Sequence, residues 1–103
     1  MQFHLYASGG PSEGRTPYLL DLQSDLLSDL TTRLVAPVRN GRDYSFPRIE
    51  KLHLSFDLDG KEHVIFISEM AAVPVDYLSS LRGELKKMKT EILSSLDFML
   101  TGF

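Results

Sequence analysis

Three histidines, at positions 4, 53 and 63, are the side chains of this chain best suited to metal binding or acid–base chemistry. No His-x-x-x-His or similar spacing of metal ligands occurs, and the sequence has no cysteine that could complete a zinc site. Histidines on the surface or on half-buried strands are the simpler interpretation, because histidine is intermediate between buried and exposed residue types. We therefore predict no metal site and no cofactor.

Pairs of carboxylates could supply a general acid and a general base, but the pairs found here have a structural explanation. Asp21 with Asp25, and Asp57 with Asp59, stand at expected strand ends and turns, where acidic residues are common. The Gly-x-Ser-x-Gly nucleophile motif, the P-loop and the dinucleotide fingerprint are absent from the sequence. The residue spacing therefore indicates no catalytic residue.

Four arginines form the one basic stretch of the sequence. Arg33, Arg39, Arg42 and Arg48 are accompanied within that stretch by a single acid, Asp43. A solvated loop is the simplest interpretation of this stretch. Its alternative role is a contact with an acidic ligand or with RNA phosphates.

Alternating apolar and polar residues predict a series of strands, with Gly-, Pro- and Ser-rich loops at residues 8–17 and 40–47. The strand that contains Pro37 should end, bulge or lie at an edge there, because proline has no N–H for a ladder. Residues 24–32 lack a period of two and predict an ordered excursion or short helical turn that exposes leucine. The predicted strands cover residues 2–7, 18–23, 32–38, 52–58 and 61–68.

The clearest local signal is a hairpin at residues 59–60, where Asp-Gly separates two strand patterns. This dipeptide favours a type I′ turn, because both central residues must take positive φ. With a two-residue turn, Phe56 faces His63 and His53 faces Phe66. The two histidines then point to opposite faces of the ribbon.

The last part of the chain predicts helix. Asp76 is placed to act as an N-cap after Pro74. From Glu84 onward, apolar residues at steps of three and four predict an amphipathic helix of about 17 residues, which ends at Gly102. Strands followed by one helix predict a mainly β fold, a small antiparallel barrel or curled sheet with the helix packed on it. The apolar stripe of the helix is Leu85, Met88, Ile92, Leu96 and Met99.

The C-terminus is unusually apolar for a chain end. Phe98, Met99, Leu100 and Phe103 lie within the last six residues, where chains commonly fray into polar tails. An apolar helix end of this kind is either docked on the core or exposed for a partner. The two alternatives stay open from the residues alone.

Length and composition predict one soluble domain over residues 1–103. The chain is 43% hydrophobic and carries a net charge of −3, and its pI near 5.5 argues against electrostatic binding of DNA or RNA. The longest apolar runs are too short to span a bilayer, so no membrane contact is expected. The first residues show no cationic and apolar signal-peptide pattern, so we expect the protein in the cytoplasm.

Segments along the whole chain resemble the CcdB family, the toxins of plasmid or chromosomal toxin–antitoxin modules. No single segment is diagnostic, but their order and spacing together are hard to obtain by chance, and the length difference falls in the first loop. The segments are Met1-Gln2-Phe3, Leu5-Tyr6, Asp21-Leu22-Gln23-Ser24-Asp25, Leu26-Leu27, Arg33-Leu34-Val35-Ala36-Pro37, Met70-Ala71-Ala72-Val73-Pro74-Val75 and the terminal Thr-Gly with its apolar neighbours.

This resemblance implies an SH3-like curled antiparallel sheet of the CcdB, Kid and MazF kind, with a small accessory sheet and a C-terminal helix. It also implies a homodimer that is not an enzyme. Such a protein binds the A subunit of DNA gyrase and traps the gyrase on cleaved DNA, and a cognate CcdA-like antitoxin neutralises it. The positions that match the gyrase contacts of the family are Leu26, Leu27, Asp97, Leu100, Thr101, Gly102 and Phe103. The positive charge of the basic stretch, and not the resemblance, makes Arg39, Arg42 and Arg48 one candidate surface for docking of the antitoxin's acidic residues.

The C-terminal end departs from the best-known pattern of the family, which ends in Trp-Gly-Ile. This chain ends in Thr101-Gly102-Phe103. A tryptophan that stacks on a gyrase arginine would contribute about 1–3 kcal/mol, and threonine cannot replace it. The departure affects the expected potency and target range more than the expected fold.

Two alternatives to gyrase poisoning come from other functional classes. The fold is shared with ribonuclease toxins, so the scaffold alone does not decide the function. RNA cleavage needs cations for phosphate and an acid–base pair, and the arginines of residues 33–48 with His53 are the best candidates. The other alternative is a homologue that dimerises and binds antitoxin but poisons nothing.

Overall fold

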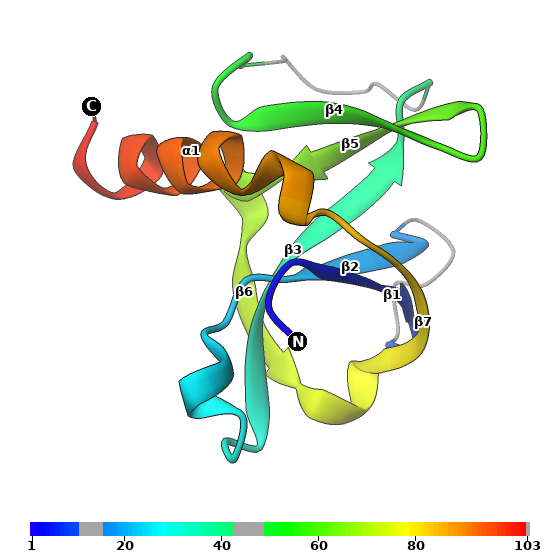
Figure 1. The fold of residues 1–103 in the computed structure, drawn as a ribbon, viewed down its shortest axis with the longest axis vertical. Coiled ribbons are helices and arrows are strands. Elements are labelled where there is room, and N and C mark those ends of the chain that lie inside the picture. The colour runs from blue at the N-terminus through cyan, green and yellow to red at the C-terminus, as the bar shows by residue number, and fades with distance from the viewer. Residues whose placement is uncertain (11–15, 43–48, 103) are drawn as a thin grey trace.

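The computed structural model describes residues 1–10, 16–42 and 49–102, so the central parts of both predicted loops lie outside the described residues. Within this part of the chain, seven antiparallel strands form one twisted sheet, and a single α-helix follows them (Figure 1). The strand order is β4-β5-β3-β2-β1-β7, and β6 also pairs with β3. The predicted mainly β fold with a C-terminal helix is confirmed. The elements are β1 (His4–Ser8), β2 (Tyr18–Asp21), β3 (Thr32–Asn40), β4 (His53–Leu58), β5 (Lys61–Phe66), β6 (Ala71–Pro74), β7 (Leu78–Glu84) and α1 (Lys89–Thr101).

The β4–β5 hairpin matches its prediction from the sequence in both turn and register. The backbone φ is 53° at Asp59 and 81° at Gly60, as a type I′ turn requires. Phe56 pairs with His63, so the predicted register is confirmed. The two histidines of the hairpin therefore face opposite sides of the ribbon.

Gly60→Ala is expected to lower the free energy of unfolding by roughly 1 kcal/mol, because an L side chain is strained at this positive φ. A Cβ at Gly60 would meet no atom within 4 Å, so the backbone conformation is the whole cause. Gly83→Ala on β7 is the matched control, since a Cβ there also meets no atom within 4 Å and its φ is not positive. Urea denaturation of both variants checks this, and equal stabilities would contradict the turn assignment.

Strand β3 is the centre of the sheet and pairs along both sides. Its residues 35–38 pair with β2 on one side, while its two halves pair with β6 and β5 on the other. The register with β6 stops at Val35 and the register with β5 resumes at Val38. Pro37 lies in this gap and pairs with Leu19 of β2, so the strand neither ends nor lies at an edge. The missing N–H of the proline is accommodated by an interruption of one ladder.

The helical prediction around Asp76 is wrong, because the chain returns to the sheet there. Val75–Tyr77 forms one turn of 3-10 helix, η3, and Leu78–Glu84 then forms β7, which pairs with β1 through two register shifts. Asp76 therefore begins no α-helix. The β7 sequence LSSLRGE has no alternation of its own, so the pairing with β1 makes it a strand.

The terminal helix begins later than the sequence predicts. Glu84 still belongs to β7, and Lys86–Met88 forms a 3-10 turn, η4, before α1 starts at Lys89. The helix ends as predicted at Gly102, which takes a left-handed conformation with φ 81°. No helix among the described residues is long and apolar enough to cross a bilayer.

One face of α1 packs on the core of the sheet. Ile92 is fully buried, and the Ser95 hydroxyl donates a hydrogen bond to the carbonyl of Lys51. The stripe prediction is confirmed for the first turns, because the apolar residues before Met99 pack against the core, whereas Met99 is 40% exposed. The helix therefore rests on the sheet at its start and leaves its C-terminal end at the surface. The cluster of buried apolar residues that contains Ile92 is Phe3, Leu5, Leu20, Leu22, Ala36, Val38, Leu52, Ile65, Ile67 and Ile92.

Candidate functional site

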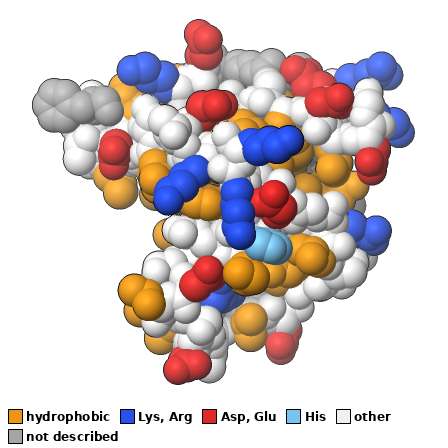
Figure 2. Space-filling view, viewed as in Figure 1, with side chains coloured by type: hydrophobic (Ala, Val, Ile, Leu, Met, Phe, Trp, Pro, Cys, Tyr) orange, Lys and Arg blue, Asp and Glu red, His pale blue; other side chains and the backbone are white. Residues whose placement is uncertain are grey.

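A short turn between β2 and β3 exposes three leucines to solvent. Asp25–Leu27 forms a 3-10 helix, η1, on which Leu26 is 94% exposed and Leu27 is 52% exposed. Leu30, which follows, is 51% exposed. Hydrophobic side chains project at the lower left of Figure 2, at the place of η1 in Figure 1. The predicted ordered excursion with exposed leucine is confirmed.

Hydrogen bonds within the chain give this turn its shape. The Ser24 hydroxyl accepts a bond of 3.2 Å from the Leu26 N–H, as in an N-cap. The Leu27 N–H donates to the Ser24 carbonyl at 3.0 Å, and the Leu30 N–H donates to the Leu27 carbonyl at 3.3 Å. The exposed leucines therefore stand on an ordered segment.

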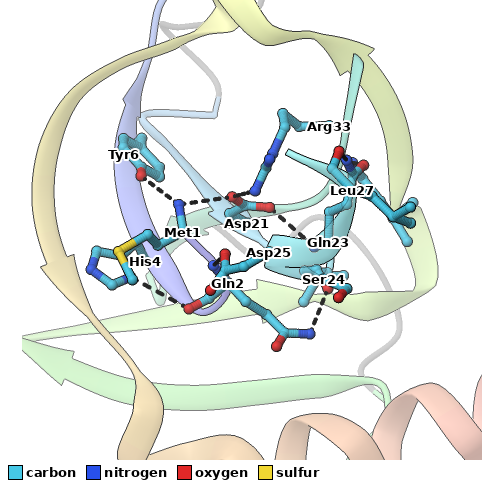
Figure 3. Close-up of polar contacts among 12 residues, drawn as sticks. Met1, Gln2, His4, Tyr6, Asp21, Gln23, Ser24, Asp25, Leu27 and Arg33 are labelled. Carbon is cyan, nitrogen blue, oxygen red and sulfur yellow. Dashed lines mark hydrogen bonds and ion pairs between the residues drawn. The ribbon is translucent and has the colours of Figure 1, made fainter. Parts of the chain in front are cut away.

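A buried ion pair lies under this turn, between β2 and β3 (Figure 3). The Asp21 carboxylate binds the Arg33 guanidinium, and the two side chains are 1% and 7% exposed. The expected solvated loop is wrong for Arg33, which lies on β3 with its charge compensated inside the protein. The sequence did contain an indication that Arg33 is buried, because alternation along β3 places Arg33 and the buried Val35 on one face of the strand.

The N-terminal residues close the same network from the other side. The Gln2 N–H donates to the Asp25 carboxylate at 2.9 Å, and the Met1 amine lies 2.9 Å from the Tyr6 hydroxyl and 3.3 Å from Asp21. Burial, with a smaller contribution from the nearby charge of Asp21, raises the pKa of Tyr6. The Tyr6 phenol is therefore neutral at physiological pH and accepts the bond from the amine.

The second group of predicted contact residues lies at the C-terminal end of α1. Leu100 is 71% exposed, and Asp97, Thr101 and Gly102 are exposed as well. The Thr101 hydroxyl donates to the Asp97 carbonyl at 2.6 Å, and the Gly102 N–H donates to the Phe98 carbonyl at 2.8 Å. The helix end is thus capped and presents Leu100 to solvent. Phe103 lies outside the described residues.

The two groups occupy separate places on the monomer. In Figure 1 the η1 turn lies at the lower left and the C-terminal end of α1 at the upper left. Leu26 and Leu27 are adjacent on η1, as are Leu100 and Thr101 on α1, but the fold does not bring the two pairs into one cluster. A single partner that contacts both must span the face between them.

Of the three arginines assigned to antitoxin docking, Arg39 is already engaged within the chain. Its guanidinium makes two bonds to Glu69, of 2.9 and 3.1 Å, and its Nε donates to the Thr16 hydroxyl at 3.1 Å. It also lies 4.5 Å from the centre of the Phe66 ring. Arg42 is exposed, and Arg48 lies outside the described residues. The docking assignment stays a prediction, for which Arg42 is better exposed than Arg39.

The histidines of the hairpin are packed rather than gathered into a site. His53 and His63 are buried, and His63 Nδ1 lies 3.0 Å from the Lys61 carbonyl. His53 Nε2 lies 3.4 Å from the Ser68 hydroxyl. Within the described residues, no three or more His, Asp or Glu side chains are grouped as metal ligands would be.

Sequence reasoning missed one polar residue of the site. Gln23 is 8% exposed and joins the η1 turn to β3 through its side-chain amide. The only indication of its burial in the sequence was its position after Leu22 in the expected second strand. That indication is weak, because a glutamine at a strand end is ordinarily solvated. Its buried environment becomes visible only when β3 is placed beside it.

Comparison with known protein families shows which family this chain belongs to. A family model described as CcdB protein matches residues 2–102. The chain belongs to the CcdB family. The match covers the η1 turn and α1 up to Gly102, so the family resemblance seen in the sequence is confirmed over both exposed segments. A search of curated protein sequences found no match.

Several solved structures share the fold of this CcdB family chain. The Mycobacterium tuberculosis toxin MazF-mt6 aligns with a TM-score of 0.75 and 15% identity, over 94% of this chain and 95% of that one. An endoribonuclease in complex with its cognate antitoxin, from a mycobacterial species, aligns with a TM-score of 0.74 and 12% identity, over 97% and 93% of the two chains. A structure described as an Mtb toxin aligns with a TM-score of 0.69 and 16% identity, over 92% and 98%. At these identities the likeness establishes the fold alone.

Proposed function

We propose that this CcdB family chain is the toxin of a type II toxin–antitoxin module, which binds the A subunit of DNA gyrase and traps gyrase on cleaved DNA. In this proposal the protein acts in the cytoplasm by binding and is not an enzyme. The observation that carries the proposal is the ordered turn η1, on which Leu26 is 94% exposed. The family membership of the whole chain supports the choice of target.

An ordered, fully exposed leucine indicates a binding surface on energetic grounds. Burying one such side chain on a partner contributes about 1.5–3 kcal/mol, none of which the monomer uses. The turn is held by hydrogen bonds in the monomer, so little conformational entropy is lost when a partner binds it. Leu100, which is 71% exposed on the capped end of α1, fits the same description. These two leucines are the expected central contacts with gyrase.

Removal of Gly102 and Phe103 is expected to abolish gyrase trapping and cell killing while the fold persists. Gly102 is exposed, and its one hydrogen bond to Phe98 contributes only about 1 kcal/mol to stability. Thermal denaturation, antitoxin binding and gyrase-mediated DNA cleavage are measured on the same truncated protein. We expect the melting temperature and antitoxin binding to change little.

Two results would contradict this role of the terminus. Full toxicity of the truncated protein would remove the terminus from the active surface, and unfolding on truncation would mean that Phe103 is needed for the core. Thr101→Trp is the reverse arm of the experiment, since it restores the family's tryptophan. It should tighten gyrase binding by about 1–3 kcal/mol where gyrase offers an arginine for stacking.

The proposal includes a homodimer. Strand β6 pairs only with β3 among the described strands, and its Ala71 and Ala72 are exposed beside the exposed Val75. Together with Met99 at the surface of α1, these residues offer apolar area that one small chain does not bury. Sedimentation at micromolar concentration should give about twice the chain mass of 11.6 kDa. A monomer under these conditions would contradict the dimer.

The proposed second partner is a cognate antitoxin with an acidic, apolar C-terminal segment that folds on the toxin. One structural neighbour is an endoribonuclease in complex with its cognate antitoxin, which supports an antitoxin for this scaffold. Arg42 is the exposed candidate for its acidic residues. Charge reversal at Arg42 and Arg48 should weaken antitoxin binding at low salt, and unchanged affinity would remove this role.

An endoribonuclease is the second candidate function, because two of the neighbouring structures are described as endoribonucleases. The observation in this chain that favours it is a pocket of about 520 Å³, in whose wall the exposed Glu50 and Glu91 lie with the largely buried His53 as a candidate acid–base group. Incubation of the purified protein with total RNA tests this candidate. Cleavage that disappears in a His53→Gln variant would favour it over gyrase poisoning.

A further inference from the structure

We propose that Gln23 is the positioning residue of the gyrase-binding surface, since its side-chain amide holds the η1 turn against β3. This inference rests on the proposed function of Leu26 and Leu27 and adds a residue that does not itself touch the partner. Gln23 is 8% exposed, so it supports the turn from beneath.

The turn places no side chain in the buried core. None of the three residues of η1 is buried, and Leu30 beyond it is also exposed. Burial of an apolar face, which positions most helices, therefore contributes little here. The segment must be held by polar contacts at its ends, and Figure 3 shows these contacts converging beneath it.

Gln23 supplies a side-chain contact that ties the turn to β3. Its Nε2 donates to the Leu27 carbonyl at 2.8 Å, and its Oε1 accepts from the Leu34 N–H of β3 at 3.0 Å. The Leu22 N–H also donates to the Leu34 carbonyl at 2.9 Å, so the Gln23 side chain extends this backbone pairing as far as the turn. A glutamine amide suits this position, because it carries a donor and an acceptor at one end.

The buried ion pair holds Gln23 in turn. The Asp21 carboxylate accepts a bond from the Gln23 N–H at 3.0 Å and also binds Arg33. The contacts therefore run from the core through Gln23 to the carbonyl of Leu27, one residue from the fully exposed Leu26. Without the amide, the turn would keep its own cap and the bond from the Gln2 N–H to Asp25, but the link from the Leu27 carbonyl to β3 would be lost. A partner would then have to order this part of the turn on binding.

The test compares Gln23→Met with the wild type in hydrogen exchange and in binding to the purified A subunit of gyrase. We expect the amides of residues 26–30 to exchange at least about tenfold faster. We expect affinity to fall about 5- to 10-fold, the loss of one net hydrogen bond. Gln23→Glu is the second variant, because it keeps the acceptor for Leu34 but cannot donate to Leu27. Ile65→Val on β5 is the control for a general loss of stability.

A double-variant cycle with Leu26→Ala separates positioning from stability. If Gln23 acts by presenting Leu26, the two losses of affinity are not additive, and Gln23→Met costs less in the Leu26→Ala background. Additive losses of affinity in the double variant would overturn the inference, as would an equal loss of affinity in Ile65→Val. Unchanged amide exchange at residues 26–30 of Gln23→Met would overturn it as well. If the wild type does not bind gyrase, the proposed function fails, and the exchange measurement still decides whether Gln23 orders the turn.

Discussion

Leu26→Asp is expected to abolish gyrase poisoning while the protein stays folded. The side chain of Leu26 is 94% exposed, so its replacement removes no core contact. Binding to gyrase should fall by at least about 100-fold, because the leucine's burial is lost and a carboxylate must be desolvated instead. Surface binding to the immobilised A subunit of gyrase and killing of a gyrase-dependent strain measure the effect.

Leu81→Asp is the matched control for this experiment. Leu81 is 59% exposed on β7, which lies on the opposite side of the molecule from η1 in Figure 1. We expect Leu81→Asp to keep wild-type toxicity. Equal effects of the two substitutions, or full activity of Leu26→Asp, would show that η1 is not the contact surface.

Arg33→Met is expected to cause the largest loss of stability, about 3–5 kcal/mol in the free energy of unfolding. The substitution leaves the Asp21 carboxylate, which is 1% exposed, without its main partner. The amine of Met1 lies 3.3 Å from the same carboxylate and offsets only part of the lost charge. Urea denaturation of the purified variant measures the loss.

The double variant Asp21→Asn with Arg33→Met is the control. Neutralising the carboxylate removes the unpaired buried charge, and the asparagine carbonyl can still accept from the Gln23 N–H. Most of the lost stability should therefore return. A loss below about 1 kcal/mol in the single variant would contradict the buried ion pair.

Local chemistry made several elements predictable. Asp59-Gly60 defines a turn through its backbone preferences alone. The register of β4 and β5 therefore followed from counting residues outward from this two-residue turn. Ile92 and the residues in step with it predicted the buried face of α1. The left-handed stop at Gly102 follows from glycine's lack of a Cβ.

The features that the sequence did not predict depend on contacts with residues far away in the chain. Leu78–Glu84 carries no strand pattern and becomes β7 only because it pairs with β1, far away in the sequence. Arg33 looked like part of a solvated loop, because its partner Asp21 lies on another strand. The sequence did not single out Gln23 for the same reason, since its two side-chain contacts form only when β3 lies beside η1.

A gyrase cleavage assay tests the proposed function most directly. Purified wild-type protein is incubated with DNA gyrase, supercoiled plasmid and ATP, the reaction is stopped with denaturant, and linear DNA is quantified. We predict that linear plasmid accumulates with increasing protein, that the Leu26→Asp variant produces none, and that total RNA in a parallel reaction stays intact. Absence of linear DNA at every ratio of protein to gyrase, with cleavage of the RNA, would contradict gyrase poisoning and favour the endoribonuclease.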